Sequence, residues 1–161
     1  MNRKALFLHR FAADENGVAA IEMALTFPII VWLTMGILEL GIIFHISSLA
    51  NFAANEASRM GKTGNNYGMQ GSREQLTYNT IRNYLEPWMI NSATLHVDSQ
   101  AYGSFRDLGQ AGRSGSVGGA NEIVIYTATM QWSYLTPLFA TITRQPSLPI
   151  TARVLTKNEN F

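Results

Sequence analysis

Two carboxylates lie in or beside a stretch of the chain that is otherwise almost wholly apolar. Glu22 immediately precedes the apolar residues 23–46, and Glu39 lies among them, where His45 is the other polar ionisable group. Inserting an ionised carboxylate into hydrocarbon costs roughly 2.5 to 3.5 kcal/mol. Each carboxylate therefore needs a partner or a position near water.

Other groupings of reactive side chains are sparse. The chain has no cysteine, which excludes disulfides, thiolate metal sites and cysteine nucleophiles. His96 and Asp98 share one face of an expected strand, as two metal ligands or a base and its orienting group would. No third ligand or nucleophile follows at a recognisable spacing, so we interpret this pair as part of a solvated strand face. We predict no enzymatic activity, no metal site and no cofactor.

Composition also argues against nucleic-acid binding. The 161 residues carry a formal net charge of +1, and the Lys and Arg residues are scattered along the chain. Binding driven by phosphate neutralisation would need these residues in a cluster. The glycine-rich residues 103–121 contain no GxxxxGK[ST] pattern, so they are not a phosphate-binding loop either.

The apolar residues 23–46 are long enough to cross a membrane. About 24 residues form a helix of about 36 Å, against a hydrocarbon thickness of about 30 Å. They begin after a basic leader that ends at Gly17, too late for an ordinary secretory signal, and Asp14 and Glu15 argue against a transit peptide. No Lys or Arg occurs between Arg10 and Arg59, which predicts a cytoplasmic amino terminus and places residues 61–161 outside the cytoplasm.

The segment FAADENGVAAIEMALTFPIIVWLTMGILELGIIF carries a resemblance to a known family. A basic leader ending in Gly17, followed five residues later by Glu22 at the head of an apolar helix, resembles the type IV prepilin pattern. Together with Pro28 and the GILELG segment around Glu39, it resembles more narrowly the TadE-like minor pilins, or pseudopilins, of the tight-adherence (Tad) pilus. The tail LPITARVLTKNENF resembles the final strand of that family more weakly, with its Asn–Glu pair.

The resemblance implies a function in pilus assembly and adhesion. It implies that residues 1–17 are a prepilin leader and that a prepilin peptidase cuts between Gly17 and Val18. The mature chain would be anchored in the bacterial inner membrane, with its carboxyl domain in the periplasm, and would join or prime the pilus. The implied partners are the peptidase, the major pilin, other minor pilins and the inner-membrane assembly platform, besides membrane lipid. An uncleaved, membrane-tethered periplasmic binding or sensing module is the alternative.

Cleavage after Gly17 would give Glu22 a candidate partner. The new ammonium of Val18 lies four residues earlier, on the same helix face and within about 6 Å. Glu22 can pair with this ammonium or with that of a neighbouring subunit, which relieves the cost of burying both charges. In the other interpretation, Glu22 lies at headgroup level and is solvated.

Glu39 and Pro28 raise separate questions. Glu39 lies about 25 Å further along the helix than Glu22, so the two cannot share one partner within the chain. Glu39 either contacts a partner helix or the assembly platform, or reaches water from the outer leaflet. Pro28 removes one helical hydrogen bond, and a local bend or an unwound turn is expected there.

The remaining residues predict an α+β, pilin-like domain. We expect one long helix over residues 18–60, with a membrane span at about 23–46, and a periplasmic domain over 61–161. Leu49, Phe52, Ala53 and Met60 recur at helical spacing, and residues 73–86 predict a second helix that ends before Pro87. Residues 93–102, 122–132 and 148–155 predict a three-stranded antiparallel sheet, with residues 103–121 as a flexible loop. The second strand alternates, with one face carrying Val124, Tyr126, Ala128, Met130 and Trp132 and the other Ile123, Ile125, Thr127, Thr129 and Gln131.

Overall fold

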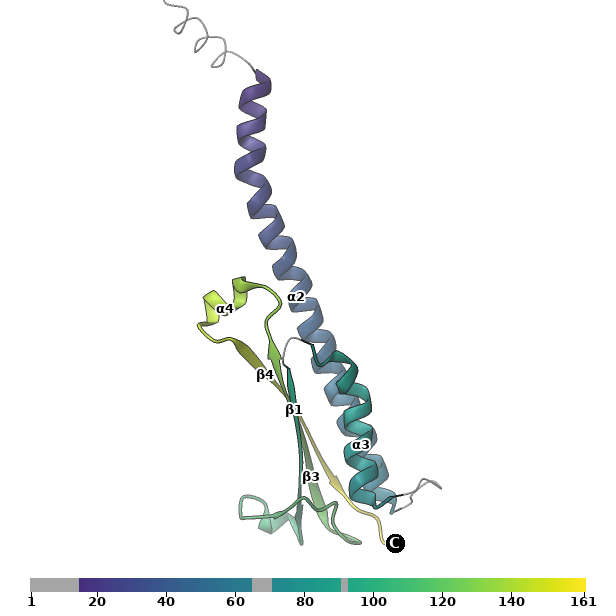
Figure 1. Cartoon of the computed structure of the whole chain (residues 1–161). Helices are drawn as coiled ribbons and strands as arrows, with labels where there is room; N and C mark the ends of the chain where they lie inside the picture. The colour runs from purple at the N-terminus through teal and green to yellow at the C-terminus, as the bar shows by residue number, and fades with distance from the viewer. Residues whose placement is uncertain (1–14, 65–70, 91–92) are drawn as a thin grey trace, which may run out of the picture. The chain divides into compact units, whose positions relative to one another are not determined.

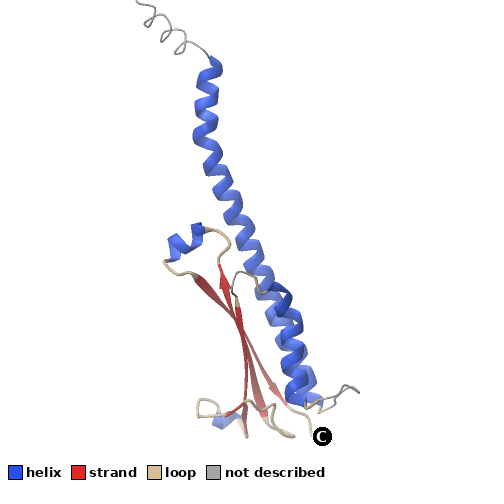
Figure 2. Cartoon of the chain, viewed as in Figure 1, coloured by secondary structure: helices blue, strands red, loops and turns tan. Residues whose placement is uncertain are grey.

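The computed structural model describes residues 15–64, 71–90 and 93–161. The chain divides into two compact units, Met1–Leu38 and Glu39–Phe161, which we call unit 1 and unit 2. In chain order the elements are α2 (Glu15–Thr63), α3 (Arg73–Leu85), η1 (Glu86–Trp88), β1 (Thr94–Tyr102), η2 (Phe105–Asp107), β2 (Arg113–Ser114), β3 (Ile123–Ser133), α4 (Pro137–Thr143) and β4 (Ser147–Lys157) (Figure 1, Figure 2).

The part of α2 in unit 1 is apolar around most of its circumference. Its large side chains are exposed, and Val18, Leu25, Ile29, Leu33 and Leu38 are examples. A helix with such a surface is typically covered by lipid or by another protein. The helix is also uninterrupted at Pro28, so the bend expected at that residue remains a prediction.

The part of α2 in unit 2 buries a row of small side chains: Ala50, Ala53, Ala54 and Ala57. Ala50, Ala54 and Ala57 pack with Ile81 and Leu85 of α3 and with two alanines of the sheet. Because alanine has no atoms beyond Cβ, the backbones can approach closely. Phe52, one of the apolar residues at helical spacing, is exposed and meets the ring of Tyr84 edge-on at 5.2 Å between centroids.

The second helix has clear start and stop signals. Ser72 caps α3 by accepting a hydrogen bond from the backbone N–H of Gln75, whose side chain in turn accepts from the backbone of Ser72. The helix ends at Leu85, two residues before Pro87, as predicted. One face buries Thr77, Ile81 and Leu85, and α3 lies beside the carboxyl-terminal half of α2 (Figure 1).

The sheet is antiparallel, in the order β2–β1–β3–β4. Across it, Val97 pairs with Ala128, which pairs with Ala152. The α+β class is confirmed, but the sheet has four strands because residues 113–114 of the glycine-rich segment add a short edge strand. The connection between the last two strands, for which we predicted no element, contains α4.

Alternation along β3 separates a buried face from a more open one. The predicted alternation is present, and the face with Val124, Tyr126, Ala128, Met130 and Trp132 is the buried one. Tyr126 reaches α2 so closely that a Cβ at Gly61 would lie 2.0 Å from its hydroxyl oxygen. Only glycine fits at position 61 without moving the tyrosine ring.

Candidate functional site

The amino-terminal motif lies at the start of α2. Residues 1–14 of the predicted leader fall outside the described residues, and α2 begins at Glu15. The bond between Gly17 and Val18 therefore lies within the described part of α2, near its amino-terminal limit. Cleavage of this bond remains a prediction.

Glu22 is exposed on the apolar helix of unit 1. Thr26 donates a hydrogen bond to its backbone carbonyl, with 2.8 Å between Thr26 Oγ1 and Glu22 O. Within residues 15–64, 71–90 and 93–161, the carboxylate itself has no ion-pair partner. Its partner remains a prediction, whether an ammonium at Val18 of this or a neighbouring chain, or water at the headgroups.

Glu39 has the opposite environment. The residue is 1% exposed, and its side chain reaches the two residues just before α4. The carboxylate accepts hydrogen bonds from the backbone N–H of Leu135 at 2.7 Å and of Thr136 at 3.3 Å, and from the hydroxyl of Thr136. We call these three hydrogen bonds the Glu39 clamp. A buried carboxylate is tolerated when such donors replace its water.

The Glu39 clamp is an intramolecular contact that neither sequence-based interpretation of Glu39 included. Its donors lie 96 and 97 positions away along the chain. The sequence offers one signal for the partner: Thr136 followed by Pro137 is a typical helix start. A contact between Glu39 and another protein remains a prediction.

The apolar residues that follow Glu39 form part of the core of unit 2. Ile46 is buried with Met130 and Trp132 of β3, and Ile42 and Ile43 pack against the same cluster. His45 lies beside Trp88, with 4.7 Å between ring centroids. The membrane span predicted from the sequence, residues 23–46, thus includes residues whose side chains pack against the protein's own sheet.

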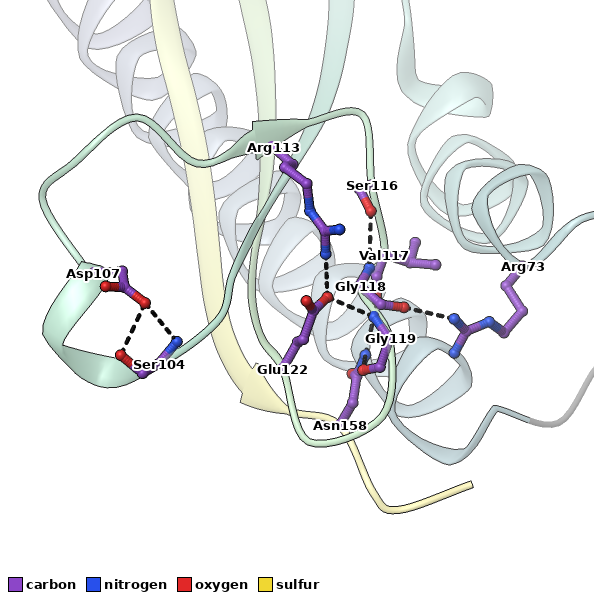
Figure 3. A network of polar contacts seen from close by, with 10 residues as sticks. All are labelled: Arg73, Ser104, Asp107, Arg113, Ser116, Val117, Gly118, Gly119, Glu122 and Asn158. Atoms are coloured by element: carbon purple, nitrogen blue, oxygen red, sulfur yellow. Dashed lines mark hydrogen bonds and ion pairs between the residues drawn. The ribbon is translucent and has the colours of Figure 1, made fainter.

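A second polar network ties the carboxyl terminus to the glycine-rich loop (Figure 3). Asn158 is buried, and its Nδ2 donates to the carbonyls of Val117 at 2.9 Å and Gly119 at 3.0 Å. Arg73 Nη2 donates to the carbonyl of Gly118 at 2.6 Å, and its guanidinium lies 4.5 Å from the ring centroid of Phe161. Although we noted the Asn–Glu pair in the tail, the sequence did not reveal these contacts.

The same loop is held by two further groups. Glu122 accepts the backbone N–H of Gly119 at 2.6 Å and pairs with Arg113 of β2, while Asp107 accepts from Ser104 (Figure 3). The loop therefore contains local structure, including η2 and β2, that we had not predicted. These contacts are structural, and they bring no set of reactive groups together.

The pair considered for metal or base chemistry lies on the open side of the sheet. His96 is exposed, and Asp98 accepts a hydrogen bond from Gln100 Nε2 at 3.3 Å. Among the residues that the structure describes, no group of three or more His, Cys, Asp or Glu side chains could hold a metal ion.

Two described groups of unit 2 have perturbed pKa values. Burial raises the pKa of Tyr126 to about 12, with Arg73 opposing the shift. The hydroxyl of Tyr126 has no hydrogen-bond partner in the described part of the chain. The hydrogen bond from Arg59 lowers the pKa of Glu56 at the surface. Neither shift involves a grouping typical of catalysis.

The comparisons with known proteins give a family match that covers most of α2. Residues 17–59 match the family model described as TadE-like protein. The match begins at Gly17, and the helix Gly17–Thr63 is long and apolar enough to cross a membrane. No curated protein and no solved structure matches the chain. The TadE-like resemblance inferred from the residues is thus confirmed.

Proposed function

From its TadE-like residues 17–59 we propose that the chain is a minor pilin, or pseudopilin, of a Tad-type adhesion pilus. In this proposal a prepilin peptidase cuts after Gly17, α2 anchors the mature chain in the inner membrane, and the chain then joins or primes the fibre. One observation carries the proposal: the family match starts at the glycine that lies five residues before Glu22, at the head of the apolar helix.

The segment we propose to span the membrane is residues 18–38. At 1.5 Å per residue it is about 31 Å long, close to a hydrocarbon thickness of about 30 Å. Its large side chains are exposed, whereas from Ile42 onward the inward side chains pack on the sheet of unit 2. We propose that lipid covers the exposed side chains of residues 18–38, whereas the sheet already covers the inward side chains from Ile42 onward.

The basic residues on the amino side of the span support a cytoplasmic amino terminus and a periplasmic unit 2. A reporter that works only in the periplasm, fused after Phe161, should be active. Activity from a cytoplasm-dependent reporter alone at that position would contradict the proposed orientation.

The proposed partners divide between the two carboxylates. The exposed Glu22 is suited to an ammonium at Val18 of a neighbouring pilin, while the carboxylate of Glu39 is occupied by its own chain. We therefore propose that pairing with the major pilin and other minor pilins depends on Glu22. The assembly platform is the further partner proposed, and the role is structural rather than enzymatic.

Processing tests the proposal. Amino-terminal sequencing of the protein from membranes that contain the prepilin peptidase should give a chain that begins at Val18. A Gly17→Leu variant should keep its leader, because a large side chain blocks the cleavage position. Gly41→Ala is the matched control, since a Cβ at that helical glycine meets nothing within 4 Å, and it should be cut normally.

An intact leader on the wild-type chain in peptidase-containing membranes would overturn the pilin proposal. That result would favour the alternative, a membrane-tethered periplasmic module whose anchor is never cut. Cleavage of Gly17→Leu at the same bond would show that processing does not depend on the glycine.

A further inference from the structure

One end of unit 2 exposes apolar side chains around α4. Leu135 and Ile142 flank or belong to this short helix, and Leu40 and Phe44 of α2 are exposed in the residues that directly follow Glu39. Between Tyr134 and Pro146 the only charged residue is Arg144, which is exposed. We call residues 134–144 the α4 foot.

The Glu39 clamp fixes where this foot lies relative to the chain. The carboxylate binds the backbone of Leu135 and Thr136, the two residues just before α4. Glu39 is covalently next to Leu38, the last residue of the proposed span. Whatever the direction of the membrane helix, the start of the foot must therefore lie close to the level at which the chain leaves the hydrocarbon.

The composition of the foot suits the membrane interface. Tyrosine and arginine are favoured there, because each has an apolar body and a polar tip, and aliphatic side chains beside them can enter the boundary with the acyl chains. The rings of Tyr134 and Phe139 stack at 5.8 Å between centroids, and Ile142 projects into solvent with 67% of its surface exposed. Water is a poor surrounding for such a surface, whereas the boundary between headgroups and acyl chains is a good one.

We propose that the α4 foot rests in the periplasmic interface of the bilayer while the chain is anchored. This inference rests on the proposed function, because it requires residues 18–38 to span the membrane. Leu135 and Ile142 enter the boundary between headgroups and acyl chains, and Arg144 reaches lipid phosphates. The Glu39 clamp thus has a mechanical role: it holds unit 2 against the membrane surface at a second point besides the helix.

The test uses the full chain in vesicles of phosphatidylethanolamine and phosphatidylglycerol that carry lipid-attached fluorescence quenchers. Because the chain has no cysteine, one label can be placed at a time. The three positions have similar exposed fractions: Ile142 in the foot (67%), Leu33 in the span (64%) and Phe105 in η2 (59%). Phe105 lies beyond the other end of β3, which at 11 residues is about 33 Å long.

If the α4 foot lies in the interface, the three labels should differ in which quenchers reach them. The Ile142→Cys label should be quenched by quenchers near the headgroups, the Leu33→Cys label by quenchers deep in the acyl chains, and the Phe105→Cys label by neither. Quenching at Leu33 without quenching at Ile142 overturns the foot and leaves the anchor intact. No quenching at Leu33 overturns the anchor, and the foot with it. Equal quenching at Ile142 and Phe105 also overturns the foot, because unit 2 would then lie flat on the lipid.

The role of the clamp has its own readout. In a Glu39→Gln background the amide NH2 must face at least one of the two backbone N–H groups, and the charge that strengthens all three hydrogen bonds is lost, so the Ile142 label should lose most of its quenching while the Leu33 label keeps its own. The near-ultraviolet circular dichroism of the aromatic core, which includes Trp132, establishes that unit 2 is still folded in this variant. Unchanged quenching at Ile142 in the folded variant would contradict the clamp's role in holding the foot.

Discussion

The two parts of α2 place similar residue types in opposite surroundings. In unit 1 the large apolar side chains, such as Leu25 and Ile29, are exposed, whereas in unit 2 the inward residues, such as Ile46 and Ala54, are fully buried. The helix is continuous in secondary structure through both. Apolar character alone therefore does not tell whether lipid or the protein's own sheet will cover a residue.

The size of the side chains distinguishes the two parts of α2 better than their apolar character does. The buried row in unit 2 consists of alanines, which let α3 and the sheet approach the helix, and the larger Phe52 points away. Among the described residues of unit 1, large apolar side chains surround the helix, and Ala19, Ala20 and Ala24 are exposed too. A row of small residues that facing elements cover indicates close packing within the chain, and a mostly apolar circumference indicates a lipid environment.

The two carboxylates repeat this contrast. Glu22 is exposed and has no ion-pair partner among the described residues, so it is available to another chain. Glu39 is buried and accepts three hydrogen bonds from residues 135 and 136. One acid is suited to assembly between chains, and the other holds one chain together.

The largest effect is expected from a charge on the buried side of α2. Ala54→Glu places a carboxylate among Ile81, Leu85 and the sheet with no partner, and should lower the free energy of unfolding of unit 2 by more than about 4 kcal/mol. Leu25→Glu, on the exposed part, is the control: it should impair membrane insertion by roughly 2.5 to 3.5 kcal/mol but leave unit 2 folded. Urea denaturation followed by near-ultraviolet circular dichroism distinguishes them. A normally folded Ala54→Glu protein would contradict the packing of α2 on the sheet.

A smaller effect is expected when the two carboxylates are neutralised. Glu39→Gln keeps the shape but leaves at least one buried backbone N–H facing the amide NH2 and removes the charge from the remaining hydrogen bonds, which should cost about 3 kcal/mol of the free energy of unfolding. Glu22→Gln should leave that free energy unchanged, since its side chain is exposed outside unit 2. Equal losses in both variants, measured by the same urea denaturation, would show that the contrast between the carboxylates is false.

The smallest effect concerns alkaline pH and is confined to the buried part. The pKa of Tyr126 is raised to about 12, so its contribution to stability is complete below its ordinary pKa of about 10 and is lost as the pH rises toward 12. The loss is at most about 2.7 kcal/mol. Tyr126→Phe should remove this pH dependence without loss of stability near neutral pH, because the hydroxyl has no partner in the described structure. Denaturation at about pH 8 and pH 11 checks this, with Tyr84→Phe as the half-exposed control that should retain the wild-type dependence.

Local patterns predicted most of the regular structure. The end of α3 follows from Pro87, and the division of β3 into two faces follows from the alternation of its residues. The sequence analysis missed α4 because this helix has only seven residues, too few to show a helical pattern of apolar residues. It missed β2 because two residues carry no periodicity.

The candidate site divides in the same way. Gly17, Val18 and Glu22 are recognisable from their spacing, because their relation is local to one helix. The clamp at Glu39 and the network at Asn158 are not, because each depends on backbone groups that only the folded chain brings near. A polar residue in an apolar run indicates that a partner exists, but not which one.

The central claim, that the exposed Glu22 pairs with another pilin after processing, is tested most directly by Glu22→Val. Crosslinking or co-purification with the major pilin should be scored beside cleavage in the same membranes. We predict that the variant is inserted and cut after Gly17 but fails to associate, because loss of a buried ion-pair partner costs about 3 to 5 kcal/mol. Glu22→Asp, which keeps the charge but shortens the side chain, should fall between the variant and wild type. Normal association of a fully cleaved Glu22→Val protein would contradict the account and leave Glu22 as a carboxylate solvated at the membrane surface.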